Sequence, residues 1–147
     1  MNRLLLLLPL VAVIAGGLPA FAEQTMTHRV AIHVDENDPQ RMNMALNNAH
    51  NVNKYYESKG ESVEVEIVAY GPGLHMLRAD TSPVKERIEQ MSLSQDGLSF
   101  SACGNTHARM SEKAGTEVAL LPEANMVPSG VVRLMELQEQ GWTYIRP

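Results

Sequence analysis

Cys103 is the residue whose type and position suggest chemistry most directly. It is the one cysteine among the 147 residues, and it stands between the strand-like run at residues 98–102 and the sequence Gly104-Asn105-Thr106. A thiol attacks as the thiolate, and its pKa falls at the amino end of a helix, where free N–H groups and the helix dipole favour an anion. We therefore predict that Cys103 accepts a sulfur atom or an oxidant and passes it on by thiol exchange.

The residues after the cysteine carry groups that such a site would use. Gly104 lets the backbone approach closely, and Asn105 or Thr106 can cap the helix or hydrogen-bond a group carried by the sulfur. His107 and Arg109 follow on the same predicted helix, where they could add positive charge or supply a proton. A second reading stays open, because free cysteine is among the most buried residue types and often serves only as a small packing residue.

A metal role is a third reading of the same segment. Cys103 and His107 are four residues apart, so both can face one side of a helix, and thiolate with a thioether from Met110 would suit Cu(I). Closed metal sites need more ligands than these, and no zinc motif or Ser-His-Asp set is visible. We therefore expect no metal and no cofactor. Three further histidines are interpreted as structural or surface residues: His28, His33 and His50.

An export leader is predicted at the start of the chain. Residues 1–3 form a short basic start, residues 4–17 are apolar, and Ala20 and Ala22 occupy the small-residue positions of a cleavage site. The apolar stretch is shorter than the roughly 20 residues of a membrane span, with an uncleaved anchor as the alternative. We predict cleavage after residue 22, a periplasmic location and no membrane association after cleavage. The lone exported thiol then stays free, is capped or pairs with another chain.

The composition of the chain limits its partners. Acidic residues outnumber basic ones, 17 to 12, and the net charge is −5. Surfaces for nucleic acids or anionic lipids need clustered lysine and arginine, so neither partner is expected. Residues 23–147 contain no repeat, low-complexity tract or linker. We interpret them as a single domain that is large enough to bury a core.

Strand and helix patterns alternate along the chain. Strands are predicted where apolar residues alternate, and helices where they recur at helical spacing between capping residues and glycines. The predicted strands are residues 28–34, 62–70, 98–102, 117–121 and 142–145. The predicted helices are residues 39–59, 105–113, one that starts near Pro83 and one between Gly130 and Gly141, with a short helical turn at 74–78. This order predicts an α/β fold with a mainly parallel sheet of about five strands and helices on both faces.

The carboxyl edge of such a sheet is the expected place for a site, because ligands of parallel α/β sheets bind there. The turns after several strands meet at that edge. The candidate binding residues are Asn37, Tyr70, Gly71, Gly73, His75, Gly104, Asn105, Thr106, His107 and Ser129. The glycine turn after residue 70 would shape the pocket, and either His75 or His107 would help to protonate or orient a group on the sulfur.

Four stretches of the chain resemble the DsrE/DsrF-like family, in particular its exported single-domain members. They are MALNNAHNVNKYY, VEIVAYGPGLHML, FSACGNT and VPSGVVRLMELQEQGWTYIRP, and the resemblance covers nearly all of residues 23–147. It implies a three-layer α/β/α fold and a homo-oligomer, commonly a trimer or hexamer. It also implies that Cys103 matches the family's cysteine at the strand end, which in sulfur-relay members carries a persulfide between partner proteins.

These observations define one leading function and two alternatives. The leading hypothesis is a periplasmic sulfur carrier or thiol-relay protein, at most sulfurtransferase-like, that exchanges sulfur on Cys103 with a partner protein or a small thiol. The first alternative is a non-enzymatic oligomeric module that binds a ligand or a protein and uses the cysteine only for packing. The second is a copper or redox-stress accessory protein.

Overall fold

The computed structural model describes residues 27–147. The predicted leader and its cleavage site, at residues 1–22, lie outside the described residues. The strands are β1 (Thr27–Val34), β2 (Ser62–Ala69), β3 (Leu98–Cys103), β4 (Ala124–Val127) and β5 (Thr143–Ile145). The helices are α1 (Pro39–Glu57), the 3-10 helix η1 (Gly71–Leu77), α2 (Lys85–Ser94), α3 (Gly104–Ala114) and α4 (Gly130–Glu139).

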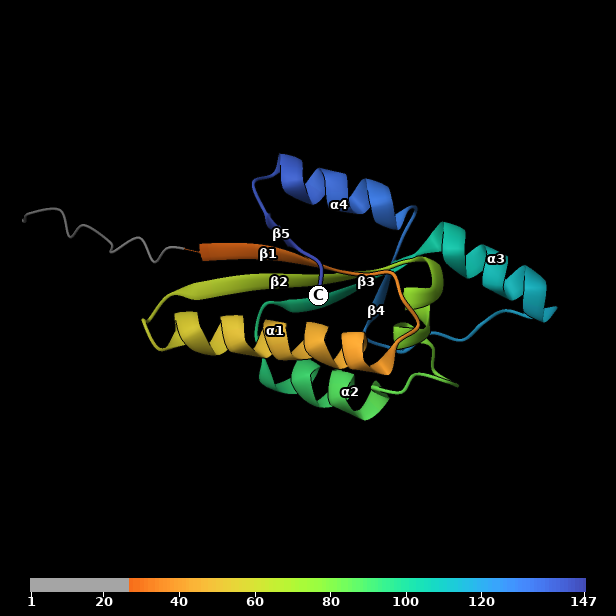
Figure 1. The fold of residues 1–147 in the computed structure, drawn as a ribbon, viewed down its shortest axis with the longest axis horizontal. Helices are drawn as coiled ribbons and strands as arrows, with labels where there is room; N and C mark the ends of the chain where they lie inside the picture. Colours follow the sequence, from red (N-terminus) through yellow and green to blue (C-terminus); the bar gives the residue numbers. More distant parts are fainter. Residues whose placement is uncertain (1–26) are drawn as a thin grey trace, which may run out of the picture.

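The five strands form one parallel sheet in the order β4-β3-β2-β1-β5. Helices α1 and α2 cover one face of the sheet and α4 covers the other (Figure 1). Helix α3 extends from the end of β3 beyond the sheet (Figure 1), and none of its residues is buried. The predicted α/β fold with a parallel sheet between helical layers is confirmed.

Alternating side chains divide the interior into two cores of unequal size. Val30 and Ile32 of β1 and Ile67 of β2 point to the face under α1 and α2, where they join the larger core. Residues of opposite parity point to the face under α4, in a small core of four buried residues: Ala31, Val68, Leu134 and Leu137. The second half of β2 is buried on both faces, as its apolar run predicts.

The turns at the carboxyl edge are fixed by capping and by close backbone contact. Asp38 accepts a hydrogen bond from the N–H of Gln40 at 2.8 Å, and Pro39 opens α1. A Cβ atom at Gly73 would lie 2.2 Å from the carbonyl oxygen of Val34. Only glycine therefore allows η1 to pack against the end of β1, which places the turn after β2 beside the site.

The fourth strand was predicted in the wrong place. Residues 117–121 do not join the sheet. They run antiparallel to residues 77–79, with hydrogen bonds from Ala79 N to Ala119 O and from Leu121 N to Leu77 O, both 2.9 Å. The apolar run belongs to a crossover that buries Val118 and Leu121 rather than to a strand of the sheet. The strand itself is β4 (Ala124–Val127), which begins three residues after the predicted strand ends.

Two smaller points concern the helices. Helix α2 begins at Lys85 after Val84, whose apolar side chain gives no cap. The Ser82 hydroxyl accepts from the N–H of Val84 at 3.3 Å and donates to the carbonyl oxygen of Met76 at 2.6 Å. Within residues 27–147, no helix combines the length and the apolar content that crossing a membrane requires.

Candidate functional site

Cys103 lies where β3 ends and α3 begins, as the N-cap residue of that helix. Strands β2 and β3 are in register up to Ala102, so Tyr70, the residue after β2, lies beside the cysteine. On the other side Cys103 pairs with Val127 of β4, and α4 begins three residues later at Gly130. The amino ends of α3 and α4 therefore both meet at the cysteine.

Two glycines permit this close approach. A Cβ atom at Gly130 would lie 2.9 Å from the Cβ and Cδ1 atoms of Tyr70 and 3.2 Å from the Cβ of Cys103. A Cβ atom at Gly104 would lie 3.0 Å from the carbonyl oxygen of Val127. Distances this short are rarely tolerated between carbon atoms of a packed interior. Glycine at position 130 therefore lets the backbone N–H of α4 approach the sulfur.

Burial and hydrogen-bond donors act in opposite directions on the thiol. Burial raises the pKa of the Cys103 thiol. Four donors lower the pKa: the hydroxyl of Thr106 and the backbone N–H groups of Gly130, Thr106 and Asn105. The donors prevail, so the pKa lies below its ordinary value. The Cys103 side chain makes no N-cap hydrogen bond, so these groups lower the pKa together, as neighbouring dipoles, rather than through one short contact.

The hydroxyl of Thr106 is oriented by the turn after β2. The N–H of Gly71 donates to Thr106 Oγ1 at 3.0 Å. A hydroxyl has one proton and two lone pairs, so accepting this bond leaves its proton available for the sulfur of Cys103. The threonine therefore links the glycine turn to the thiol, and both were among the predicted binding residues.

An open depression of about 490 Å³ surrounds the cysteine. Its lining consists of Tyr70, Cys103, Asn105, Thr106, Ala108, Arg109, Ser129 and Val131. Cys103 itself is only 5% exposed, so the thiol belongs to the base of the depression rather than its rim. The arrangement combines backbone N–H donors and one guanidinium with a single nucleophile, which suits an anionic group on the sulfur.

The structure gathers six of the predicted binding residues around the sulfur: Tyr70, Gly71, Gly104, Asn105, Thr106 and Ser129. The others lie elsewhere. Asn37 is exposed in the turn before α1, His75 lies 3.4 Å from the hydroxyl of Thr81, and His107 bonds the carbonyl oxygen of Val118 through Nε2 at 2.7 Å. Gly73 packs η1 against β1 and does not line the depression. The cation at the depression is Arg109 rather than a histidine.

His33, interpreted from the sequence as a structural or surface residue and not as part of the site, continues the row of side chains away from the cysteine. It is buried under α4, and its ring stacks on Tyr70 with centroids 4.5 Å apart. Its Nδ1 atom bonds the hydroxyl of Tyr144 at 2.8 Å, and its buried Nε2 atom makes no hydrogen bond but lies 4.0 Å from Oδ2 of Asp35. Burial lowers the pKa of His33, Asp35 opposes this, and Arg146 lowers it further. The imidazole is therefore neutral at neutral pH and holds the Tyr70 wall of the site.

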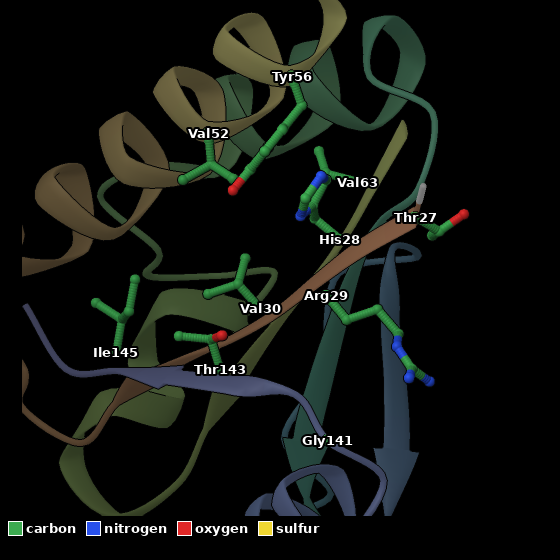
Figure 2. Close-up of a pocket in the computed structure, with 10 residues that line it drawn as sticks. All are labelled: Thr27, His28, Arg29, Val30, Val52, Tyr56, Val63, Gly141, Thr143 and Ile145. Atoms are coloured by element: carbon green, nitrogen blue, oxygen red, sulfur yellow. The ribbon is translucent and has the colours of Figure 1, made fainter. Parts of the chain in front are cut away.

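A second hollow, of about 310 Å³, lies at the opposite end of β1 (Figure 2). Val52 and Tyr56 reach into it from α1, and Thr143 faces them from β5 (Figure 2). The ring of His28 stacks on Tyr56 at 3.6 Å, and its Nε2 atom pairs with Glu61 at 2.6 Å. The His28 imidazole is thus already paired with Glu61. Because the hollow is also remote from the thiol, we assign the hollow no part in the cysteine site.

Few side chains near Cys103 are available as copper ligands. In the part of the chain that the structure describes, no three His, Cys, Asp or Glu side chains gather closely enough to hold a metal ion. His107 is engaged with a backbone carbonyl, and Met110 packs against the larger core. A thiolate and a single distant imidazole do not make a closed site.

Comparison with known proteins places this geometry in a family. The sequence profile of the DsrE/DsrF-like family matches residues 28–147. The solved structure of MTH1491, a protein of unknown function from Methanobacterium thermoautotrophicum, is 33% identical in sequence, with a TM-score of 0.66, over 82% of this chain and 99% of that chain. No curated protein matches the chain. The region matched by the profile includes Cys103 and both helices that begin beside it.

Proposed function

The chain belongs to the DsrE/DsrF-like family, and we propose that it is an exported carrier that holds a sulfur atom on Cys103 as a persulfide. The observation that carries the proposal is the convergence of two helix amino ends on one free thiol. A purely structural cysteine needs no hydrogen-bond donors, and burial alone would make it less acidic. Here the donors outweigh burial, as a nucleophile requires.

The transfer step needs no oxidant or cofactor. The Cys103 thiolate attacks the outer sulfur of a persulfide donor, R–S–SH, and forms a new S–S bond. The donor S–S bond breaks, and its electron pair leaves with R–S⁻, which takes up a proton from solvent. The product is Cys103–S–SH. Transfer to an acceptor thiolate repeats the exchange in the other direction, so no net oxidation occurs.

The site suits the charged forms of this cycle. The N–H groups of Asn105, Thr106 and Gly130 would stabilise the thiolate before attack and the terminal persulfide sulfur after it. Arg109 at the wall of the depression attracts an anionic donor. The depression admits a small thiol or an extended loop of a donor protein.

Intact mass spectrometry of the purified protein tests the carrier role. After treatment with polysulfide we expect an added mass of about 32 Da, one sulfur atom as in persulfidation, and its loss after addition of a thiol. Because the chain has one cysteine, the Cys103→Ser variant is a complete control. The proposal fails if the folded protein gains no sulfur and its thiol alkylates only after unfolding.

Export and self-association are part of the same proposal and have their own tests. Cleavage after Ala22 predicts a mature protein that begins at Glu23 and is released with the periplasmic fraction. Three apolar side chains on the outer side of α4, Val131, Val132 and Met135, are about half exposed, which favours a homo-oligomer. Light scattering with size-exclusion chromatography measures its mass. A monomer at micromolar concentration would remove the trimer and hexamer expectation.

A further inference from the structure

A buried polar cluster joins α4 to the sheet one turn away from the cysteine site. The guanidinium of Arg133 donates from Nε to Oε1 and from Nη2 to Oε2 of Glu66, both at 2.7 Å. The hydroxyl of Ser101 donates to the same Oε1 atom at 2.6 Å. Glu66 is 4% exposed. Its negative charge is compensated by the guanidinium of Arg133, and the Ser101 hydroxyl adds a neutral hydrogen bond. The cluster takes no part in the sulfur chemistry proposed above.

The cluster is connected to the sulfur by short, rigid steps. Ser101 lies two residues before Cys103 on β3, so both side chains point to the face under α4. Arg133 lies three residues after Gly130, and its N–H bonds the carbonyl oxygen of Ser129 at 2.9 Å in the first turn of α4. The Arg133 side chain, anchored on Glu66, therefore holds the first turn of α4, and this turn carries the Gly130 N–H.

Apolar packing contributes little to fixing the position and orientation of α4. The core beneath this helix has only four buried residues, two of them Leu134 and Leu137 on the helix itself. Such contacts are non-directional and would tolerate sliding or rotation of the helix. A bidentate arginine–carboxylate pair, by contrast, fixes both distance and orientation.

We propose that Glu66 and Arg133 are positioning residues, which hold the amino end of α4 over Cys103 so that the Gly130 N–H reaches the sulfur. The role deepens the proposed function and rests on it for its biological meaning. Its physical content is the ionisation of one thiol, which can be measured without any sulfur donor.

The test replaces the ion pair by a neutral pair of similar volume. In Glu66→Gln/Arg133→Met one charge of each sign is lost, so the net charge stays constant and any effect on the thiol reflects position. Replacing a whole buried pair is often tolerated, whereas removal of one partner leaves a buried charge. The titratable and charged side chains nearest the sulfur, Tyr70 and Arg109, are unchanged. Arg133→Lys is the second variant, because it keeps the charge but loses the bidentate geometry.

The readout is the 13Cβ resonance of the single cysteine, followed by NMR as a function of pH. We expect the Cys103 pKa to rise by about one unit in the double variant and by less in Arg133→Lys, since one charge-assisted donor is weakened. Glu136→Gln is the matched control: it removes the other carboxylate near Arg133, 3.6 Å away and about half exposed, and should leave the pKa unchanged.

Each outcome bears on the proposal. An unchanged pKa in a folded double variant would overturn it and show that packing alone places α4. If the double variant does not fold, Arg133→Lys decides, and an unchanged pKa there overturns the proposal equally. A pKa shift without sulfur loading in the unmodified protein would support the positioning role and reject the carrier function. Sulfur loading of the unmodified protein without a pKa shift in the variants would support the carrier function and reject the positioning role.

Discussion

The hydroxyl of Thr106 offers the cleanest way to alter the thiol. Thr106→Val keeps the shape of the side chain and its branching but removes the hydroxyl that lowers the Cys103 pKa and accepts from the Gly71 N–H. All three backbone donors remain in place. The variant therefore isolates the side-chain contribution to the acidity of the cysteine from that of the two helix ends.

The expected size follows from the energy of one hydrogen bond to a charged group. Such bonds contribute roughly 1.5–3 kcal/mol, and the contacts here are not tight, so we take the lower end. At about 1.4 kcal/mol per pKa unit, loss of the hydroxyl should raise the Cys103 pKa by about one unit. The Gly71 N–H also loses its acceptor, which should lower the free energy of unfolding by about 1–3 kcal/mol.

The rate of alkylation by iodoacetamide as a function of pH measures this change, because only one residue can react. Mass spectrometry follows the modified fraction, and the midpoint of the profile gives the thiol pKa. Thr106→Ser, which keeps the hydroxyl, is the control and should titrate close to the unmodified protein. A Thr106→Val profile that coincides with that of the serine variant would refute the assignment of the hydroxyl as a donor.

Three further perturbations test separate parts of the structure. Gly130→Ala should push α4 away from Tyr70 and raise the Cys103 pKa in the same NMR titration, whereas Val132→Ala on the outer side of the turn should leave it unchanged. Gly73→Ala should lower the free energy of unfolding, measured in urea, by about 3 kcal/mol or more, because the new Cβ meets backbone atoms. In the control Gly60→Ala the new Cβ meets no atom within 4 Å, so the loss should be only the roughly 1–2 kcal/mol of a left-handed backbone. The pKa of His33 is lowered in the fold, so the unfolded chain binds more protons below about pH 6.5 and the free energy of unfolding must fall as the pH drops. The His33→Phe variant should therefore lose less stability between neutral pH and about pH 5 than the unmodified protein. An equal loss in both proteins would contradict the assignment.

Most strands could be predicted because burial on one face leaves a strong alternating pattern. Residues 28–34 and 62–70 show it plainly, and β1 and β2 form the centre of the sheet. Residues 117–121 suggested a strand because four of the five are apolar, but this apolar run buries Val118 and Leu121 in a crossover. Strand β4 at the sheet edge is short and mostly exposed or half-buried. Its sequence therefore carries no alternation that could distinguish it from a loop.

The site was predictable only as far as it is local. Cys103 and its donors Asn105 and Thr106 belong to one strand–helix junction, and that junction is readable from adjacent residues. The donor at Gly130 comes from a distant segment, and it reaches the sulfur only because β4 pairs with β3. His33 could have been suspected, since a sheet covered on both faces buries residues of both parities.

The acidity of Cys103 is a property of the tertiary structure rather than of the cysteine alone. Its donors belong to α3 and α4, and the Thr106 hydroxyl among them is oriented by the turn after β2, while the burial that opposes them comes from the sheet itself. Met110 packs the middle of α3 against the larger core, and His107 and Ser111 bond the backbone of Val118. At the amino end of α3 the N–H of Asn105 bonds the carbonyl oxygen of Pro128 at 3.3 Å. Fraying of this end would remove the donors of Asn105 and Thr106 and leave burial to dominate. Any change at this end of α3 would therefore alter the nucleophilicity of the thiol without touching the sulfur.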